Sequence, residues 1–172
     1  MKKIETVLWK GIWALPPFPV VLVTVAHNIM TADAFHFYSF KPPMVMVGIV
    51  PERYTYELIL RENEFGINIP TTQQLEVVRI CGSISGRETT DKYCLARVTP
   101  FQGTCIKSHL IQECPVNLEC SVVHQVNFEG THQWFIGAIL AVHIDENYTR
   151  DQPLMFWSGE YRRVGEFIAR SG

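Results

Sequence analysis

Residues 81–93, CGSISGRETTDKY, gather the side chains best suited to hold an anion. The stretch contains two glycines, several hydroxyls, one arginine and one lysine. Glycines let backbone N–H groups approach a phosphate, hydroxyls donate hydrogen bonds, and an arginine can bind two oxygens at once. The spacing is neither that of a Walker A loop nor that of a GxGxxG turn. Taken alone, the stretch fits an ordinary polar surface loop at least as well as an anion-binding loop.

Two further stretches carry residue types that could contact other parts of the same ligand. Residues 28–35, NIMTADAF, set small residues beside polar ones, so an aromatic ring could lie flat against the backbone there. Arg53 and Thr55 fall at an expected strand-to-helix junction, where free N–H groups and the helix dipole favour a phosphate. The alternatives are a buried strand for the first stretch, and a surface arginine beside a threonine cap for the second.

The first half of the chain is expected to mix strands with short helices. Short, apolar, β-branched runs predict strands at residues 20–26, 44–50 and 64–70. The turn before residues 29–40, which are rich in aromatics, is expected at His27-Asn28.

Helices are expected at two places, on different signals. Apolar and acidic residues at helical spacing predict a short helix over residues 54–63. Thr71 and Gln74 match a capping box, so a second helix should run from Thr71 to about residue 80. The polar, glycine-containing residues 82–93 predict an ordered loop.

From residue 118 onward only strands are expected. A strand over residues 118–126, a turn over 127–130 and a return strand over 132–144 form a predicted hairpin, and 154–157 form a last short strand. Strands outnumber helices, which favours an antiparallel barrel with helices packed outside. Period-two alternation places on one face of the first of these strands Leu118, Cys120, Val122, His124 and Val126.

Length and composition narrow the class of protein. The 172 residues fit one domain over residues 1–172, and 47% hydrophobic with 19% charged residues indicate a substantial core. A net charge of −2 and the lack of a basic run give no reason to expect nucleic acid. Glu5, Lys10 and a cluster of prolines interrupt the N-terminal apolar residues, so neither a signal peptide nor a membrane span is expected. The expected location is cytoplasmic.

The five cysteines form no recognisable metal or disulfide pattern. Their number is odd and no CxxC occurs, so reduced and mostly packed thiols are expected. His124 and His143 lack a metal-like spacing to Cys120, and no metal ligand is assigned.

Short words along nearly the whole chain, taken in order, resemble the flavin-reductase-like, FMN-binding split-barrel family, which includes flavoredoxin. The resemblance implies a mainly β fold, an antiparallel split β-barrel with a few flanking helices. It also implies FMN as a non-covalent cofactor and a homodimer with the FMN near the subunit interface. The words are PVVLVT at 19–24, NIMTA at 28–32, SFKPP at 39–43, RYTYELI at 53–59, INIP at 67–70, CGSISGRETTDKY at 81–93, TPF at 99–101, LEC at 118–120 and GTHQWFIGAI at 130–139.

The resemblance also implies roles for particular residues. His132 matches a histidine that is associated with nicotinamide binding in some members, although position 131 is threonine where the family has aspartate. The segment along the flavin and its ribityl chain is matched by Asn28, Met30, Thr31, Ala32 and Ala34. A phosphate-side loop is matched by Arg53, Tyr54 and Thr55. A second flavin-contacting loop is matched by Cys81, Ser83, Ser85, Gly86 and Arg87. Because an arginine can bind two oxygens at once, Arg87 is expected to contact the phosphate.

The function that the resemblance implies is an FMN-binding oxidoreductase. Electrons would pass from a reduced donor, NAD(P)H or a protein, through bound FMN to a flavin, metal or protein acceptor. One alternative is a flavoredoxin-type electron carrier or flavin-binding module without its own NAD(P)H site. Another is a related split barrel that binds haem or pyridoxal phosphate.

Overall fold

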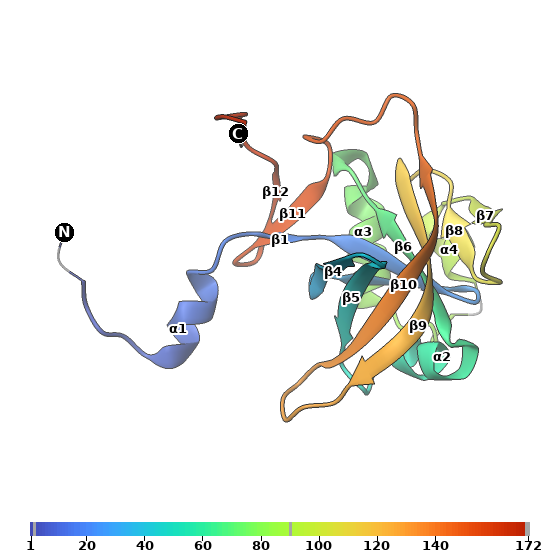
Figure 1. Ribbon diagram of the computed structural model, residues 1–172, viewed down its shortest axis with the longest axis horizontal. Helices are drawn as coiled ribbons and strands as arrows, with labels where there is room; N and C mark the ends of the chain where they lie inside the picture. Colours follow the sequence, from blue (N-terminus) through green and yellow to red (C-terminus); the bar gives the residue numbers. More distant parts are fainter. Residues whose placement is uncertain (2, 90, 171–172) are drawn as a thin grey trace.

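The apolar run at residues 20–26 forms strand β2 (Val21–Val25), which is buried on both faces. The structure is a computed structural model that describes residues 1, 3–89 and 91–170 (Figure 1). Val21, Val23 and Val25 point into one hydrophobic cluster, whereas Leu22 packs into a second. Burial of both faces explains why the run is continuously apolar instead of alternating with polar residues.

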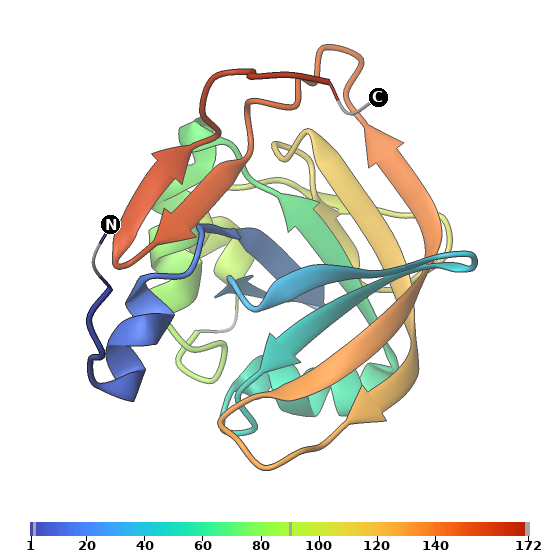
Figure 2. The same ribbon diagram turned by 60° about the vertical axis from the view of Figure 1, so that its left-hand side comes forward.

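β2 belongs to a seven-stranded antiparallel sheet that curls into a half-barrel (Figures 1 and 2). The strand order is β3-β2-β6-β9-β10-β5-β4. The mainly β, antiparallel split barrel expected from the sequence is therefore confirmed. The other strands of this sheet are β3 (Asn28–Ala32), β4 (Phe35–Phe40), β5 (Pro43–Ile49), β6 (Glu64–Ile69), β9 (Val116–Val126) and β10 (Gln133–Ile144).

Helices pack outside the curled sheet and hold the two hydrophobic clusters against it. Helix α2 (Tyr54–Glu62) buries Leu58 and Ile59 in the cluster inside the barrel, and ends at Asn63 in the left-handed conformation. Helix α3 (Leu75–Ser83) and helix α4 (Lys92–Ala96) cover the second cluster. Of the two predicted helices, the one over residues 54–63 is confirmed by α2, whereas the other begins later and ends later than predicted, at Leu75 and Ser83. Helix α4 was not predicted.

The predicted capping box is present, with a tighter first turn than expected. The Thr71 backbone N–H donates to Gln74 Oε1 at 3.0 Å, and Thr71 Oγ1 accepts from the Gln73 N–H at 3.2 Å. Residues Thr72–Gln74 form a 3-10 turn before α3 begins. Because α3 runs to Ser83 and α4 begins at Lys92, the loop predicted over residues 82–93 is wrong at both of its ends.

Two local predictions are wrong because of backbone irregularities. The first hairpin turns at Ala26 and His27, with Ala26 at a φ of 51°, so that Asn28 is already in β3. A bulge in β9 leaves Val123 unpaired between the residues facing Ile136 and Gly137. The extra residue shifts the alternation. His124 is therefore exposed and does not share the buried side of Cys120.

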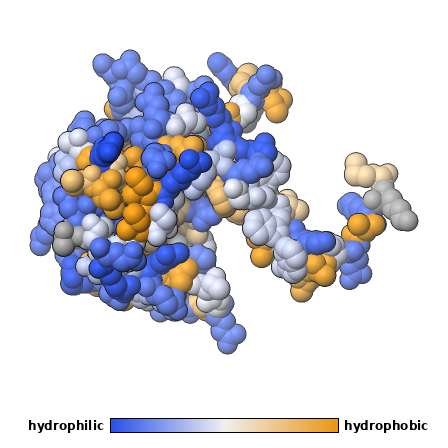
Figure 3. Space-filling model, turned by 180° about the vertical axis from the view of Figure 1, so that it is seen from behind, coloured by the Kyte–Doolittle hydropathy of each residue, from blue (hydrophilic) through white to orange (hydrophobic). Residues whose placement is uncertain are grey.

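Small elements flank the half-barrel. Strand β1 (Phe18–Pro19) pairs with β11 (Leu154–Trp157), which pairs with β12 (Glu160–Arg163). Strands β7 (Pro100–Gln102) and β8 (His109–Ile111) form a separate hairpin. Helix α1 (Leu8–Trp13) buries none of its residues, and Figures 1 and 3 show it on an arm that leaves the body of the protein. Among the described residues, no helix is long and apolar enough to cross a membrane.

Candidate functional site

A cleft forms where β3, the start of α2, the end of α3 and the start of α4 meet. It has a narrow inner part of about 30 Å³ and a wider outer part of about 560 Å³. The residues lining the inner part, here called the inner cleft, are Asn28, Met30, Arg53, Tyr54, Thr55, Cys81, Gly82, Ile84, Ser85, Gly86 and Lys92. The outer part, here called the outer cleft, shares Asn28, Tyr54, Gly86 and Lys92 and adds Ala26, His27, Leu58, Arg61, Arg87, Glu88 and Thr89.

Asn28 presents an unpartnered acceptor at this cleft. The tight turn at Ala26 and His27 makes Asn28 the first residue of β3, and its side chain is 5% exposed. Its Nδ2 donates to Thr55 Oγ1 at 2.8 Å, whereas its Oδ1 is buried with no hydrogen-bond partner in the described part of the chain. Because buried acceptors are costly to leave unpaired, a ligand donor is the expected partner of this oxygen.

Gly86 is required for the way the chain passes over Asn28. A Cβ at position 86 would lie 2.2 Å from Asn28 Oδ1 and 2.8 Å from Tyr54 Cδ1. Any larger residue would push the loop away from β3 and α2. The glycine predicted for close backbone approach therefore lies against the one unpartnered side-chain oxygen of the inner cleft, as far as the described residues show.

Lys92, the lysine of the 81–93 stretch, is a functional candidate to which the sequence alone assigned no particular role. Its side chain is 3% exposed, and Nζ donates to the carbonyl oxygens of Ile29 at 2.7 Å and Cys81 at 3.3 Å. No carboxylate within the described residues forms a salt bridge with it. Burial is the main cause that lowers the pKa of Lys92; Cys81 and Glu88 oppose this shift, and the nearby positive charge of Arg53 adds to it. Its only signal in the sequence is a position inside the polar 81–93 stretch, beside apolar residues.

The two cations of the inner cleft give it a clear electrostatic character. Arg53 and Lys92 both line it, and neither forms a salt bridge among the residues described. Two like charges that face one small space repel each other unless an anion lies between them. The inner cleft is therefore suited to an anion, and a phosphate could accept hydrogen bonds from both side chains.

Cys81 lies at the end of α3 and lines the inner cleft as a neutral thiol. Burial raises the pKa of Cys81 to about 11, so that the thiolate is scarce at neutral pH. A thiol in this state is a poor nucleophile, and packing against a ligand is the role that remains. All five cysteines are free; three are buried, and Cys94 and Cys105 are exposed.

Arg87 lines the outer cleft, but its guanidinium is already held by α2 and the residues before it. Nη1 donates to the Glu52 carbonyl at 3.0 Å, Nη2 pairs with the Glu57 carboxylate, and the group lies 5.3 Å from the centre of the Tyr54 ring. Of the predicted site residues, the structure therefore brings nine to this cleft: Asn28, Met30, Arg53, Tyr54, Thr55, Cys81, Ser85, Gly86 and Arg87.

The remaining predicted residues lie outside the linings of the cleft. Thr31 donates its hydroxyl to the Val78 carbonyl at 2.6 Å, and Ser83 donates to the Arg79 carbonyl at 2.9 Å. Ala32 packs in the cluster inside the barrel, and the Ala34 carbonyl accepts from the Gly48 N–H at 2.7 Å. His132 is exposed just before β10, where Nδ1 lies 2.9 Å from the hydroxyl of its neighbour Thr131.

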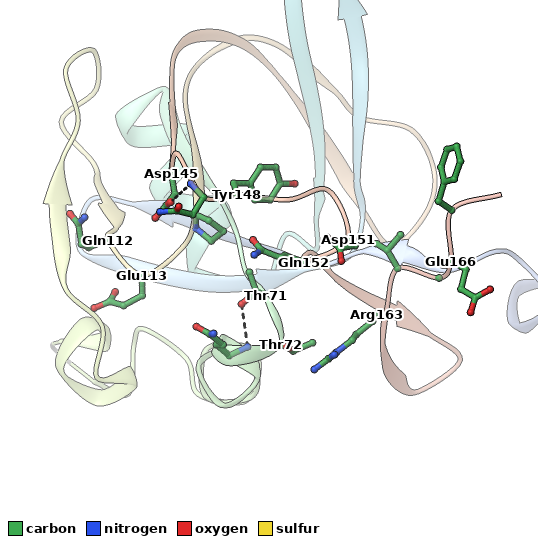
Figure 4. A pocket seen from close by; sticks show the side chains of 16 residues that line it. Thr71, Thr72, Gln112, Glu113, Asp145, Tyr148, Asp151, Gln152, Arg163 and Glu166 are labelled. Atoms are coloured by element: carbon green, nitrogen blue, oxygen red, sulfur yellow. Dashed lines mark hydrogen bonds between the residues drawn. The ribbon is translucent and has the colours of Figure 1, made fainter. Parts of the chain in front are cut away.

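A larger hollow lies elsewhere and has the opposite charge character. Its volume is about 860 Å³, and Figure 4 shows the acidic side chains around it. Arg163 is the one basic residue among its lining residues. Negative charge in this number disfavours an anionic ligand, so the candidate site is the smaller cleft with Lys92 and Arg53. The acidic residues of the lining are Glu113, Asp145, Asp151 and Glu166.

Comparison with known proteins gives the family. The model of the flavin reductase like domain matches residues 14–165. The chain belongs to this family. It is 36% identical over 126 residues to a protein of Archaeoglobus fulgidus whose function is not assigned, covering 73% of this chain and 70% of that protein.

Solved structures of the same family superpose along nearly the whole chain. The flavoredoxin of Desulfovibrio vulgaris (Miyazaki F) is 29% identical with a TM-score of 0.83, over 99% of this chain and 97% of that one. An FMN-binding protein from Thermus thermophilus, solved with bound p-hydroxybenzaldehyde, is 25% identical with a TM-score of 0.84, over 99% of each chain.

Proposed function

We propose that this protein binds FMN non-covalently at the cleft between β3, α2 and the loop over residues 84–89, and that it passes electrons through the bound flavin. Membership of the flavin reductase like family supports a flavin as the ligand. A similar solved structure is an FMN-binding protein. The flavin would supply the redox chemistry, while the protein supplies binding, orientation and electrostatics.

The observation that carries the proposal is the buried ammonium group of Lys92, with Arg53 nearby and no salt-bridge partner for either within the described chain. A flavin mononucleotide has one phosphate, and this pair of cations would hold it. Asn28 Oδ1 would accept from a ligand N–H or hydroxyl. Gly86 would allow the loop backbone to lie directly against Asn28 and cover that contact.

The test is to measure flavin uptake by the purified protein. We expect one FMN per chain, released on denaturation, with weaker binding of riboflavin because it lacks the phosphate. FAD is expected to bind less well than FMN, because the chain has no dinucleotide fingerprint. A colourless protein that takes up neither FMN nor FAD in titration would contradict the proposal.

The electron donor divides this proposal into two versions, an NAD(P)H-dependent reductase and a flavoredoxin-type carrier. The reductase is favoured by the family. The carrier is favoured by the position of His132, which lines neither part of the cleft within the chain. In a reductase, His132→Ala should slow flavin reduction by NADH or NADPH roughly a hundredfold, because hydride transfer depends steeply on geometry.

The same variant should leave dithionite reduction and FMN affinity unchanged. In a carrier, the unaltered protein should already react slowly with both nicotinamides, and His132→Ala should change little. Stopped-flow measurement of flavin absorbance with NADH, NADPH and dithionite distinguishes the two. A fast reaction that survives the substitution would remove His132 from the site and keep the reductase.

We further propose that the protein is a homodimer with the flavin near the subunit interface. Helix α1 supports this, because none of its residues is buried and helices this short are not stable alone in water. Its large apolar side chains need cover; the most exposed are Leu8, Trp9, Ile12 and Trp13. Light scattering should give twice the chain mass, and a stable FMN-loaded monomer at low concentration would contradict the dimer.

A further inference from the structure

The side chain of Arg87 joins the loop over residues 84–89 to the start of α2. Its two hydrogen-bonded partners, the carbonyl of Glu52 and the carboxylate of Glu57, lie before and within the first turns of α2. The guanidinium also lies over the Tyr54 ring, at 5.3 Å from its centre, where a cation is attracted by the aromatic face. Three separate contacts thus bind one loop side chain to one helix end.

This loop forms part of the wall of the cleft. Ser85 and Gly86 line the inner cleft, whereas Arg87 and Glu88 line the outer cleft. The position that a Cβ of Gly86 would take is 2.2 Å from Asn28 Oδ1. With the loop in this position the inner cleft measures only about 30 Å³, whereas the outer cleft beside it measures about 560 Å³, the size of a typical ligand pocket.

We propose that Arg87 and Glu57 are positioning residues that hold this loop against α2 and thereby set how fast the inner cleft opens to its ligand. Arg87 then acts through the loop, and the phosphate is left to Lys92 and Arg53. The identity of the ligand as a flavin rests on the proposed function. The contacts of Arg87 with Glu57, Glu52 and Tyr54 are here called the latch. The evidence for the latch is these contacts and the position of Gly86.

The two possible roles of Arg87 predict opposite effects when Glu57 is removed. If Arg87 binds the phosphate, Glu57→Gln frees its guanidinium and removes a nearby negative charge, so FMN should bind more tightly. If Arg87 is a latch, the same substitution loosens the loop, and the ligand should leave faster. A latch cannot distinguish FMN from riboflavin, because it acts on the loop and not on the phosphate.

The expected changes in the dissociation rate follow from the solvent exposure of Arg87 and Glu57. Arg87 and Glu57 are both about half exposed, and exposed ion pairs contribute modestly. We expect Glu57→Gln to raise the dissociation rate about two- to fivefold for FMN and for riboflavin alike. Arg87→Ala also removes the hydrogen bond to Glu52 and the contact with the Tyr54 ring, so we expect it to raise the dissociation rate about tenfold. The double variant should match Arg87→Ala, because both substitutions remove one interaction.

Stopped-flow release of FMN and of riboflavin from the full-length protein measures these rates. Arg79→Ala is the matched control, since Arg79 forms an exposed pair with Glu76 on α3 at 3.8 Å and lines neither part of the cleft. It should leave both rates unchanged. Tighter FMN binding in Glu57→Gln, or an effect of Arg87→Ala on FMN alone, would overturn the latch.

Alkylation of Cys81 provides a second measurement that needs no cofactor. Cys81 is 2% exposed in the inner cleft, so N-ethylmaleimide reaches it only when the cleft opens. Peptide mass spectrometry should show faster labelling in Glu57→Gln, with Cys114, equally buried in the second cluster, unchanged. Equal acceleration at both thiols would mean general loosening and would overturn the latch. If the protein takes up no flavin, the proposed function fails while this measurement still decides the latch.

Discussion

Two polar, glycine-containing loops of this protein handle their hydrogen-bonding groups in opposite ways. In the loop over residues 103–108, Glu119 accepts the N–H groups of Thr104, Cys105 and Ile106 at 2.9, 2.6 and 2.9 Å. Glu64 accepts those of Lys107 and Ser108 at 2.8 and 2.7 Å. The N–H groups of this loop are therefore hydrogen-bonded to carboxylates of the protein itself.

The loop over residues 84–89 lies instead beside a buried lysine without a salt bridge and an asparagine oxygen without a partner, within the part of the chain described. Both loops contain a glycine pressed against a polar side chain, Gly103 against Glu119 and Gly86 against Asn28. Composition therefore does not separate a structural loop from the loop proposed to bind the flavin. The difference is whether the protein supplies the opposite charge or leaves it to a ligand.

The largest effect that this comparison predicts is on stability at Glu119. Its side chain is fully buried, and Nε2 of His143 lies 2.6 Å from Oε1. Glu119→Ala should lower the free energy of unfolding by about 3–5 kcal/mol, because it leaves one buried and two partly buried N–H groups without their acceptor. Urea unfolding monitored by circular dichroism measures it. Glu113→Ala is the control: it removes an exposed carboxylate that accepts from Thr99 and should cost far less.

The same carboxylate should make the fold sensitive to acid. Burial alone would raise the pKa of Glu119, but the hydrogen bonds from His143 and from three backbone N–H groups outweigh it and lower the pKa to about 2. Since the value in the unfolded chain is near 4.5, this stabilisation is complete above that pH. It should be lost as the pH falls from about 4.5 to about 2. Unfolding free energies measured across this range should fall less steeply in Glu119→Gln.

Lys92 should show the reverse pattern, with a large loss of flavin binding and only a small change in stability. Lys92→Met removes a charged donor, so FMN affinity should fall about ten- to a hundredfold, and riboflavin affinity much less. The unfolding free energy of the flavin-free protein should change little, because relief from burying a charge without a salt bridge offsets the loss of the hydrogen bonds to the Ile29 and Cys81 carbonyls. Lys107→Met, in the loop over residues 103–108, is the control and should alter neither flavin affinity nor stability.

Should Lys92→Met destabilise the flavin-free protein as strongly as Glu119→Ala, the contrast between the loops would fail. Lys92 would then be a structural residue that holds Ile29 and Cys81 through their carbonyls. Isothermal titration for the ligands and urea unfolding for stability, on the same preparations, separate the two outcomes.

The smallest expected effect compares the two glycines directly. A Cβ at Gly103 would lie 2.4 Å from Glu119 Cδ, and one at Gly86 would lie 2.2 Å from Asn28 Oδ1. Gly103→Ala should cost about 1–3 kcal/mol of stability, because the crowded carboxylate is buried and fully bonded. Gly86→Ala should shift a loop that can move outward, so it should weaken flavin binding and leave stability nearly unchanged. The contrast between the two loops would fail if Gly86→Ala lowered stability and Gly103→Ala weakened only flavin binding.

Local patterns in the sequence determined most of the elements. The β-branched run of β2, the helix at Tyr54–Glu62, the capping box of Thr71 and Gln74, and the β9–β10 hairpin were all predicted. Each depends on interactions between residues close in the chain, or on a hydrophobic period that repeats over a few residues. The ordered series of family words also placed the chain in its fold, which the half-barrel confirms.

Only the tertiary structure decided which polar residues face the cleft. The bulge at Val123 depends on pairing with β10, and no local pattern announces it. Lys92 becomes important because β3 and the end of α3 surround its ammonium group, and Ile29 is 63 positions away in the chain. Arg87 meets Glu57 across 30 positions. Burial and charge pairing depend on segments that are far apart in the chain. Residue types alone therefore identified candidate site residues but not their partners.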